Sequence, residues 1–435
     1  MTSLPTPRGL LAPAKVARSP LTPAAIALAS MLALATAMGL GRFAFTPLLP
    51  MMLKDGVIDL PSASWLASAN YAGYLVGALL CTVQPWLSAR LQSLPKVVAS
   101  HWIKGGLAAT SVLTLGMAFQ WPALWPWLRF AAGVASAFVF VFTSGWCLAQ
   151  LSARGASSLG GVMYAGPGAG IALSGLLASG MVALDWPAAA GWLILGLLAA
   201  ALTATAWRSF QSAPEAPLLA TTATSSITTT AATVTPAADA LPDASRSQML
   251  VLALAYGLAG FGYIITATFL PVIARQALPG SSWLDLFWPL FGLGVVVGAL
   301  LCTRISLSGD LRYWLAGSYG VQALAVAVTV WSPTLAGFAM GSLLLGIPFT
   351  AITFFAMQEV RRLRPHSARS YMGLLTAVYG LGQIAGPPMA AALLRRAATF
   401  GAGFTLSLEI AASCLVAGAL LYLWMTRSYP MPVRQ

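Results

Sequence analysis

Long apolar runs recur along almost the whole of this chain. Each is roughly 20 residues long, the length that an α-helix needs to cross about 30 Å of hydrocarbon. Only 8% of the 435 residues are charged, whereas a soluble domain carries about 25%. The runs do not alternate apolar and polar residues, so the sequence predicts an all-α membrane bundle and not a β-barrel. The twelve predicted membrane-spanning helices are 24–52, 63–85, 97–119, 125–150, 159–182, 187–207, 248–273, 283–304, 314–332, 335–358, 371–394 and 402–426.

The positive charges of the loops are distributed unevenly between the two sides of this bundle. Of the 23 lysines and arginines, seventeen fall on the side of both termini, only Lys54, Arg275, Arg395 and Arg396 fall on the other, and Arg42 and Arg129 lie inside predicted spans. Positive residues concentrate on the cytoplasmic side of membrane proteins. We therefore expect a protein of the inner membrane with both termini in the cytoplasm. The same distribution explains the net charge of +13 without a nucleic-acid partner.

An alternative interpretation of the N-terminus is a secretory signal peptide cleaved near Ala35-Thr36-Ala37. Cleavage there would leave 38–52, which is too short to span, and an odd number of helices. The uneven distribution of charge would then be lost. We therefore expect that the N-terminal segment is not cleaved, since only then do the number of helices and the distribution of charge agree.

The chain divides into two similar halves. A segment rich in Thr, Ala, Ser and Pro, 208–247, is predicted to be a disordered cytoplasmic linker between two six-helix bundles, 24–207 and 248–426, with cytoplasmic tails at 1–23 and 427–435. Gly39-Leu40-x-x-Phe43 recurs as Gly257-Leu258-x-x-Phe261, and the seven residues from Val76 recur from Val297. Six plus six helices in a parallel repeat are the architecture of the major facilitator superfamily of transporters, whose substrates bind between the halves.

Four stretches make the resemblance more specific. They are GLGRFAFTP from Gly39, NYAGY from Asn70, YGLAGFGYII from Tyr256 and YGLGQIAGP from Tyr379. They resemble the YbfB/YjiJ-type branch of the major facilitator superfamily over nearly the whole chain, which implies a transporter of unassigned substrate. The residues expected to serve helix packing or gating are Gly39, Gly41, Pro47, Gly166, Pro167, Gly170, Gly386 and Pro387.

Two wider signatures bear on coupling and direction. Arg129 to Gly133 resembles the RxxxG pattern of proton-coupled members of the superfamily, and Ala165 to Gly170 is similar to the glycine–proline signature of antiporters. The second resemblance favours efflux. Its physical basis is that glycines let helices approach closely, while a proline leaves a carbonyl unpaired and a place to bend.

Arg42 lies deep inside the first predicted span, where burial of a guanidinium costs at least about 2.5 kcal/mol. It either contacts an anion or a gate between the halves, or it bonds to carbonyls freed by Pro47 or Pro50. In the repeat, Arg42 corresponds to Gly260 and Arg129 to Gly337. A residue required by each six-helix unit would recur in both halves, so the asymmetry favours a role in cargo or coupling. Arg129 could instead reach lipid headgroups.

The other candidates are carboxylates and neutral polar residues. Glu409 is the carboxylate predicted to lie well inside a span and is a candidate proton carrier, although its helix is expected to face lipid. Asp285 is a candidate partner for Arg42, or an ordinary acid at a helix start. Five further side chains could bind a ligand or tie helices together: Asn70, Tyr71, Tyr263, Gln358 and Gln383.

The sequence offers no paired carboxylates, phosphate-binding loop or metal-ligand cluster, so an enzyme, a metal site or a bound cofactor is not expected. We predict a secondary transporter that moves a small organic, anionic solute by alternating access, with protons as the coupling ion, efflux as the direction, and lipids as its surroundings. An uptake symporter or a uniporter is the first alternative. A non-transporting sensor or scaffold is the second.

Overall fold

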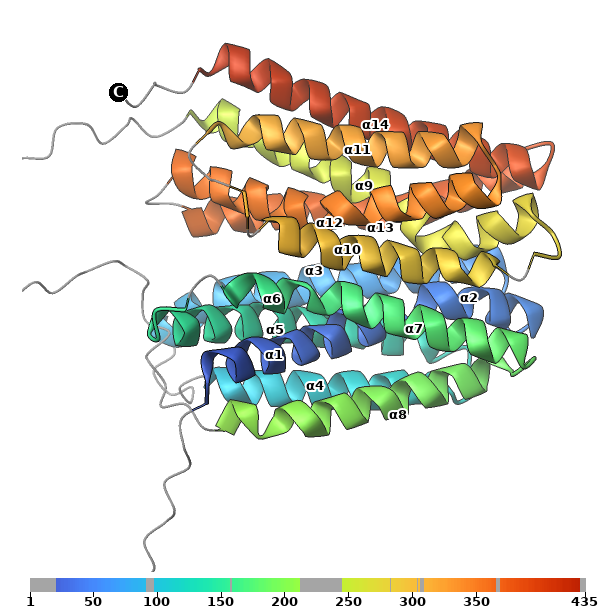
Figure 1. Cartoon of the computed structure of the whole chain (residues 1–435), viewed down its shortest axis with the longest axis horizontal. Coiled ribbons are helices and arrows are strands. Elements are labelled where there is room, and N and C mark those ends of the chain that lie inside the picture. The colour runs from blue at the N-terminus through green and yellow to red at the C-terminus, as the bar shows by residue number, and fades with distance from the viewer. Residues whose placement is uncertain are drawn as a thin grey trace, which may run out of the picture.

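The protein is built from helices that lie roughly side by side (Figure 1). The computed structural model describes residues 21–90, 98–156, 159–211, 245–281, 283–302, 304–305, 309–364 and 368–430. Most of the predicted linker and tails therefore lies outside the described residues. The elements are α1 Pro23–Leu34, η1 Ala35–Arg42, α2 Phe45–Lys54, α3 Leu60–Arg90, α4 Ala99–Gly116, α5 Trp125–Ser152, α6 Gly160–Tyr164, α7 Gly166–Ala183, α8 Ala188–Trp207, η3 Ser209–Gln211, α9 Arg246–Ala277, η4 Leu284–Leu286, α10 Phe287–Cys302, α11 Leu311–Trp331, α12 Leu335–Leu363, α13 Ala368–Arg396 and α14 Phe400–Ser428.

Eleven spans among the described residues are long and apolar enough to cross a membrane. Each coincides with one of the predicted spans, with ends that differ by several residues. The predicted span 97–119 corresponds to α4, which is not among the eleven and carries His101 and Lys104 in its first two turns. The apolar runs thus predict the helices well, and the count of twelve spans stays a prediction.

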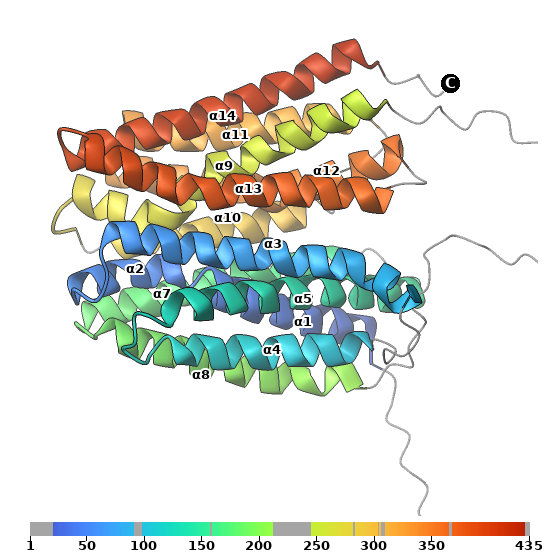
Figure 2. The same ribbon diagram turned by 180° about the vertical axis from the view of Figure 1, so that it is seen from behind.

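The helices of the N-terminal and C-terminal parts of the chain occupy different sides of the molecule. In Figures 1 and 2, α9 to α14 lie above α1 to α8. The two groups meet along α3 with α13, along α7 with α10, and where α2 contacts α9. We call the end of the molecule at which α1 and α9 begin and α14 ends the terminal end, and the opposite one the distal end.

The first span is not one continuous α-helix. Its middle, η1, is a π-helical segment, and the α-helical pattern resumes only at Phe45. Gly39 lies against Gly170 of α7 so closely that a Cβ on Gly39 would stand 2.4 Å from the Gly170 Cα. Small residues at both positions allow this approach. π-Helical segments are rare and occur often at functional sites, and this one ends at Arg42.

Candidate functional site

Arg42 lies between the two groups of helices, in the distal half of the molecule, with 3% of its surface exposed. Its guanidinium donates to Oε1 of Gln383 on α13 at 2.7 Å. The ring of Tyr74 lies 3.9 Å from the guanidinium carbon, and the rings of Phe43 and Tyr71 lie at 5.3 and 5.4 Å. Among the described residues no carboxylate pairs with Arg42, and its Nε has no hydrogen-bond partner.

Arg129 of α5 holds the break in the first span. Its guanidinium donates to the carbonyl oxygens of Gly41 and Arg42 at 3.1 and 2.8 Å. In a continuous α-helix the Arg42 carbonyl would accept a hydrogen bond from the amide of Thr46. Here that amide donates to the carbonyl of Phe43 instead. The sequence offered Arg42 the carbonyls freed by Pro47 or Pro50, whereas the carbonyls that receive a guanidinium here are those of Gly41 and Arg42, and the donor is Arg129. Arg129 is buried, so it does not reach the headgroup region.

Three of the neutral candidates surround these arginines. Gln383 bonds to Arg42 through its oxygen, and its amide nitrogen donates to the hydroxyl of Tyr263 on α9. Asn70 donates to the Arg129 carbonyl at 2.8 Å. The structure therefore brings Arg42, Arg129, Asn70, Gln383 and Tyr263 into one network, which joins α3, α5, α9 and α13.

The remaining neutral candidates lie at its edge or away from it. The Tyr71 hydroxyl lies 3.0 Å from that of Thr268, which links α3 to α9. Gln358 is half-buried near the terminal end of α12 and is not part of the network. Sequence spacing does not place these side chains relative to each other, since their contacts are made across helices.

Two acidic candidates do not join Arg42. Asp285 forms an ion pair with Arg275 of α9, so the predicted pairing of Asp285 with Arg42 is wrong for this structure. The reason is proximity, because Arg275 lies at the distal end of α9 and faces the start of α10. Glu409 is exposed on α14, as expected for a helix that faces lipid. Neither acid neutralises the charge of Arg42.

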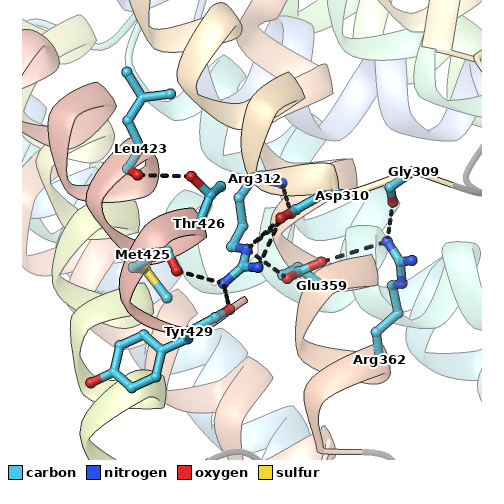
Figure 3. A network of polar contacts seen from close by, with 9 residues as sticks. All are labelled: Gly309, Asp310, Arg312, Glu359, Arg362, Leu423, Met425, Thr426 and Tyr429. Atoms are coloured by element: carbon cyan, nitrogen blue, oxygen red, sulfur yellow. Dashed lines mark hydrogen bonds and ion pairs between the residues drawn. The ribbon is translucent and has the colours of Figure 1, made fainter. Parts of the chain in front are cut away.

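Glu359 is a buried carboxylate that the apolar pattern does not reveal. The predicted span ends at 358, but α12 continues to Leu363, so Glu359 is a second carboxylate on a membrane-spanning helix, about one turn from its end. Figure 3 shows Glu359 between Arg312 and Arg362, at 3.6 and 3.8 Å. Asp310 bonds to Arg312 at 2.8 Å. The Asp310-Leu311-Arg312 sequence after α10 was the signal that could have located this network.

The guanidinium of Arg312 also caps the C-terminal end of α14. It donates to the carbonyls of Met425 and Tyr429, each at 2.9 Å (Figure 3). Arg362 donates to the carbonyl of Gly309 at 2.7 Å. This terminal-end network thus ties α11, α12 and α14 together with charges of both signs.

The two groups of helices are joined by hydrogen bonds toward the distal end. Besides Arg42 with Gln383 and Tyr71 with Thr268, Thr46 donates to the Ala267 carbonyl at 2.9 Å. Two more connect Ser68 to the Ile384 carbonyl at 2.8 Å and Ser179 to the Asp285 carbonyl at 2.9 Å. All five lie at or beyond the middle of their helices on the distal side, so these five bonds join the two groups at that side.

Eleven helical spans among the described residues are long and apolar enough to cross a membrane, which defines the class as a multi-pass membrane protein. A family model described as "Uncharacterised MFS-type transporter YbfB" matches residues 34–423, and the chain belongs to this family. The resemblance found in the sequence is thereby confirmed. The protein is a transporter and not an enzyme.

A solved structure adds the fold. The chain is similar to the crystal structure of the nucleoside transporter NupG (D323A mutant), with a TM-score of 0.67 and 14% sequence identity, over 92% of this chain and 99% of that one. At this identity the likeness establishes the fold alone. No curated protein matches the sequence.

Proposed function

We propose that this protein is a secondary active transporter that moves a small organic anion across the inner membrane, with Arg42 as the contact for the anionic group. The observation that carries the proposal is a buried guanidinium with no carboxylate partner among the described residues. Burial of an unpaired charge is costly, and an anionic cargo would supply the missing charge. Arg129 holds the backbone from which Arg42 projects.

The proposed mechanism is alternating access of two six-helix bundles, 24–207 and 248–426, which together hold twelve spans. The fastening at the distal end supports a conformation closed on that side. On α12, half-buried Phe349, Thr353 and Met357 recur every four residues. Thr353 accepts a hydrogen bond from Tyr256 of α9 at 3.0 Å, so the α12 face that carries these three residues points toward α9. The partial exposure of this face supports an opening toward the terminal end.

The proposed orientation places the terminal end in the cytoplasm, as the distribution of lysines and arginines favours. The conformation described above then faces the cytoplasm. The glycine–proline pattern, which here forms the α6–α7 junction at Gly166, supports efflux with proton antiport. An uptake symporter or a uniporter would use the same site, and a sensor or scaffold would bind the anion without moving it.

The test is transport in proteoliposomes. Everted and right-side-out vesicles are loaded with a radiolabelled organic anion, and exchange is measured with and without a pH gradient. Antiport predicts that a gradient, acid on the side that receives the anion, accelerates its movement toward that side. A rate of exchange that is independent of the pH gradient identifies a uniporter. Faster movement of the anion toward the alkaline side identifies a symporter. Binding without exchange, or equal exchange by Arg42→Gln, would contradict the proposal.

A further inference from the structure

Three tyrosine rings form a column that leads away from Arg42. Tyr256 and Tyr263 lie seven residues apart on one face of α9, and Tyr379 of α13 stacks on both. The ring centroids are 4.7 Å apart at 25° for Tyr256 with Tyr379, and 6.0 Å apart at 22° for Tyr263 with Tyr379. Gln383, one turn beyond Tyr379, bonds to Arg42. The column therefore runs from Arg42 toward the terminal end.

A second set of rings lies beside the column. The ring of Phe349 on α12 forms edge-to-face pairs with Tyr263, Phe43 and Phe291, with ring centroids 5.1, 6.1 and 5.8 Å apart. Phe43 follows Arg42 directly in the chain. Through Phe43, aromatic side chains of α9, α10, α12 and α13 are thus connected to the rings that contact the Arg42 guanidinium.

Some of these rings are accessible and others are not. Tyr263 and Phe43 are 1% and 2% exposed, whereas Tyr74, Tyr379 and Phe349 are half-buried. Tyr379 and Phe349 belong to faces that contact α9, and part of each ring is left uncovered by its neighbours. A solute that approaches from the terminal end would meet aromatic surface before it meets the Nε of Arg42, which lacks a partner.

On the basis of the proposed function, we infer that the cargo is a planar aromatic carboxylate. Its carboxylate pairs with the guanidinium of Arg42, and its ring lies against Tyr379 and Phe349. The faces of aromatic rings are negative and their edges are positive, so a planar ring gains offset-stacked and edge-to-face contacts that a saturated ring of the same size cannot make. The rings of Phe43, Tyr71 and Tyr74 stabilise Arg42 between transport cycles by cation–π contacts.

Three probes separate the parts of this inference: benzoate, cyclohexanecarboxylate and benzamide. Their dissociation constants are measured by calorimetry on the purified full-length protein. Benzoate is expected to bind about threefold to tenfold more tightly than cyclohexanecarboxylate, the range that one or two ring contacts provide. Benzamide, which has the ring without the charge, is expected not to bind. Arg42→Gln should abolish binding of both acids.

A pair of variants tests the role of the ring. Tyr379→Leu should remove most of the preference for benzoate while cyclohexanecarboxylate still binds. Tyr371→Leu, a matched change on the same helix at a ring that contacts Arg364 instead, should leave the preference unchanged. A loss of affinity for both acids in Tyr379→Leu would mean that Tyr379 only supports the fold, and would overturn the inference.

The outcomes also separate this inference from the proposed function. If wild type binds both acids equally and Arg42→Gln binds neither, the aromatic inference fails and anion recognition stands. If benzamide binds as tightly as benzoate, both fail. If neither acid binds, the aromatic inference fails, and a wider panel of anions then decides the proposed function.

Discussion

Two buried arginines in this protein have opposite surroundings. Arg312, at the terminal end, is fully buried between the carboxylates of Asp310 and Glu359 and two helix-end carbonyls. Arg42, in the distal half, is almost as deeply buried, and its surroundings are neutral: Gln383 accepts its hydrogen bond and aromatic rings lie against it. We propose that the same side chain is a structural tie where its charge is matched, and a contact for the anion where it is not.

The largest expected effect comes from breaking the matched network. Arg312→Met leaves Glu359 and Asp310 without their main cation and frees the carbonyls of Met425 and Tyr429. We expect a loss of about 3–5 kcal/mol in stability, the usual cost of removing one member of a buried ion pair. Denaturation of the purified protein in detergent measures it. The double variant Arg312→Met with Glu359→Met should recover part of the loss, and additive losses would show that the two residues do not interact.

Arg129→Gln should have an intermediate effect. The variant removes the donors that satisfy the Gly41 and Arg42 carbonyls in the broken first span. Leaving buried acceptors unsatisfied costs about 1–3 kcal/mol, and the backbone that carries Arg42 should lose its position. The free energy of unfolding and the affinity for the anion should therefore both decrease. A variant that loses affinity with full stability would mean that Arg129 contacts the anion itself.

Arg42→Gln should cost little stability, within about 1 kcal/mol of wild type. The change removes a buried charge without leaving a carboxylate unpaired, unlike the change at Arg312. Anion-dependent stabilisation should disappear in the same variant. A loss as large as that of Arg312→Met would show that Arg42 is a structural residue and would remove the contrast between the two sites.

The smallest effect is expected for Glu409→Gln. Glu409 is exposed on α14 and pairs with no cation among the described residues. Stability and the dependence of transport on a pH gradient should be unchanged. A loss of the pH dependence would make Glu409 the proton carrier, and proton coupling would then act far from Arg42.

The spans and the burial of Arg42 could be predicted because they depend on local properties. Apolar runs of sufficient length identify helices, and a charge within such a run is informative by its depth alone. The asymmetry between Arg42 and Gly260 also has a physical counterpart. Gly260 lies so close to the Tyr379 backbone that a Cβ there would stand 2.3 Å from its carbonyl oxygen, and this approach brings the tyrosine column together.

The partners of these residues could not be predicted because they come from distant parts of the chain. Arg42 and Gln383 are 341 residues apart, and no spacing rule connects them. The role of Arg129 required knowledge of the π-helical segment, which the glycines permit but do not specify. The burial of Glu359 could not be predicted for a simpler reason. The apolar run ends at 358, whereas α12 continues through charged residues to Leu363.

The most direct test of the account is the thermal stability of wild type and Arg42→Gln against a panel of organic anions, with uridine as a neutral compound. A ligand at about 100 times its dissociation constant adds about 2.7 kcal/mol of stability. The account predicts that at least one anion stabilises wild type to this extent and leaves Arg42→Gln unchanged. Equal stabilisation of both proteins by an anion, or stabilisation by uridine alone, would contradict it.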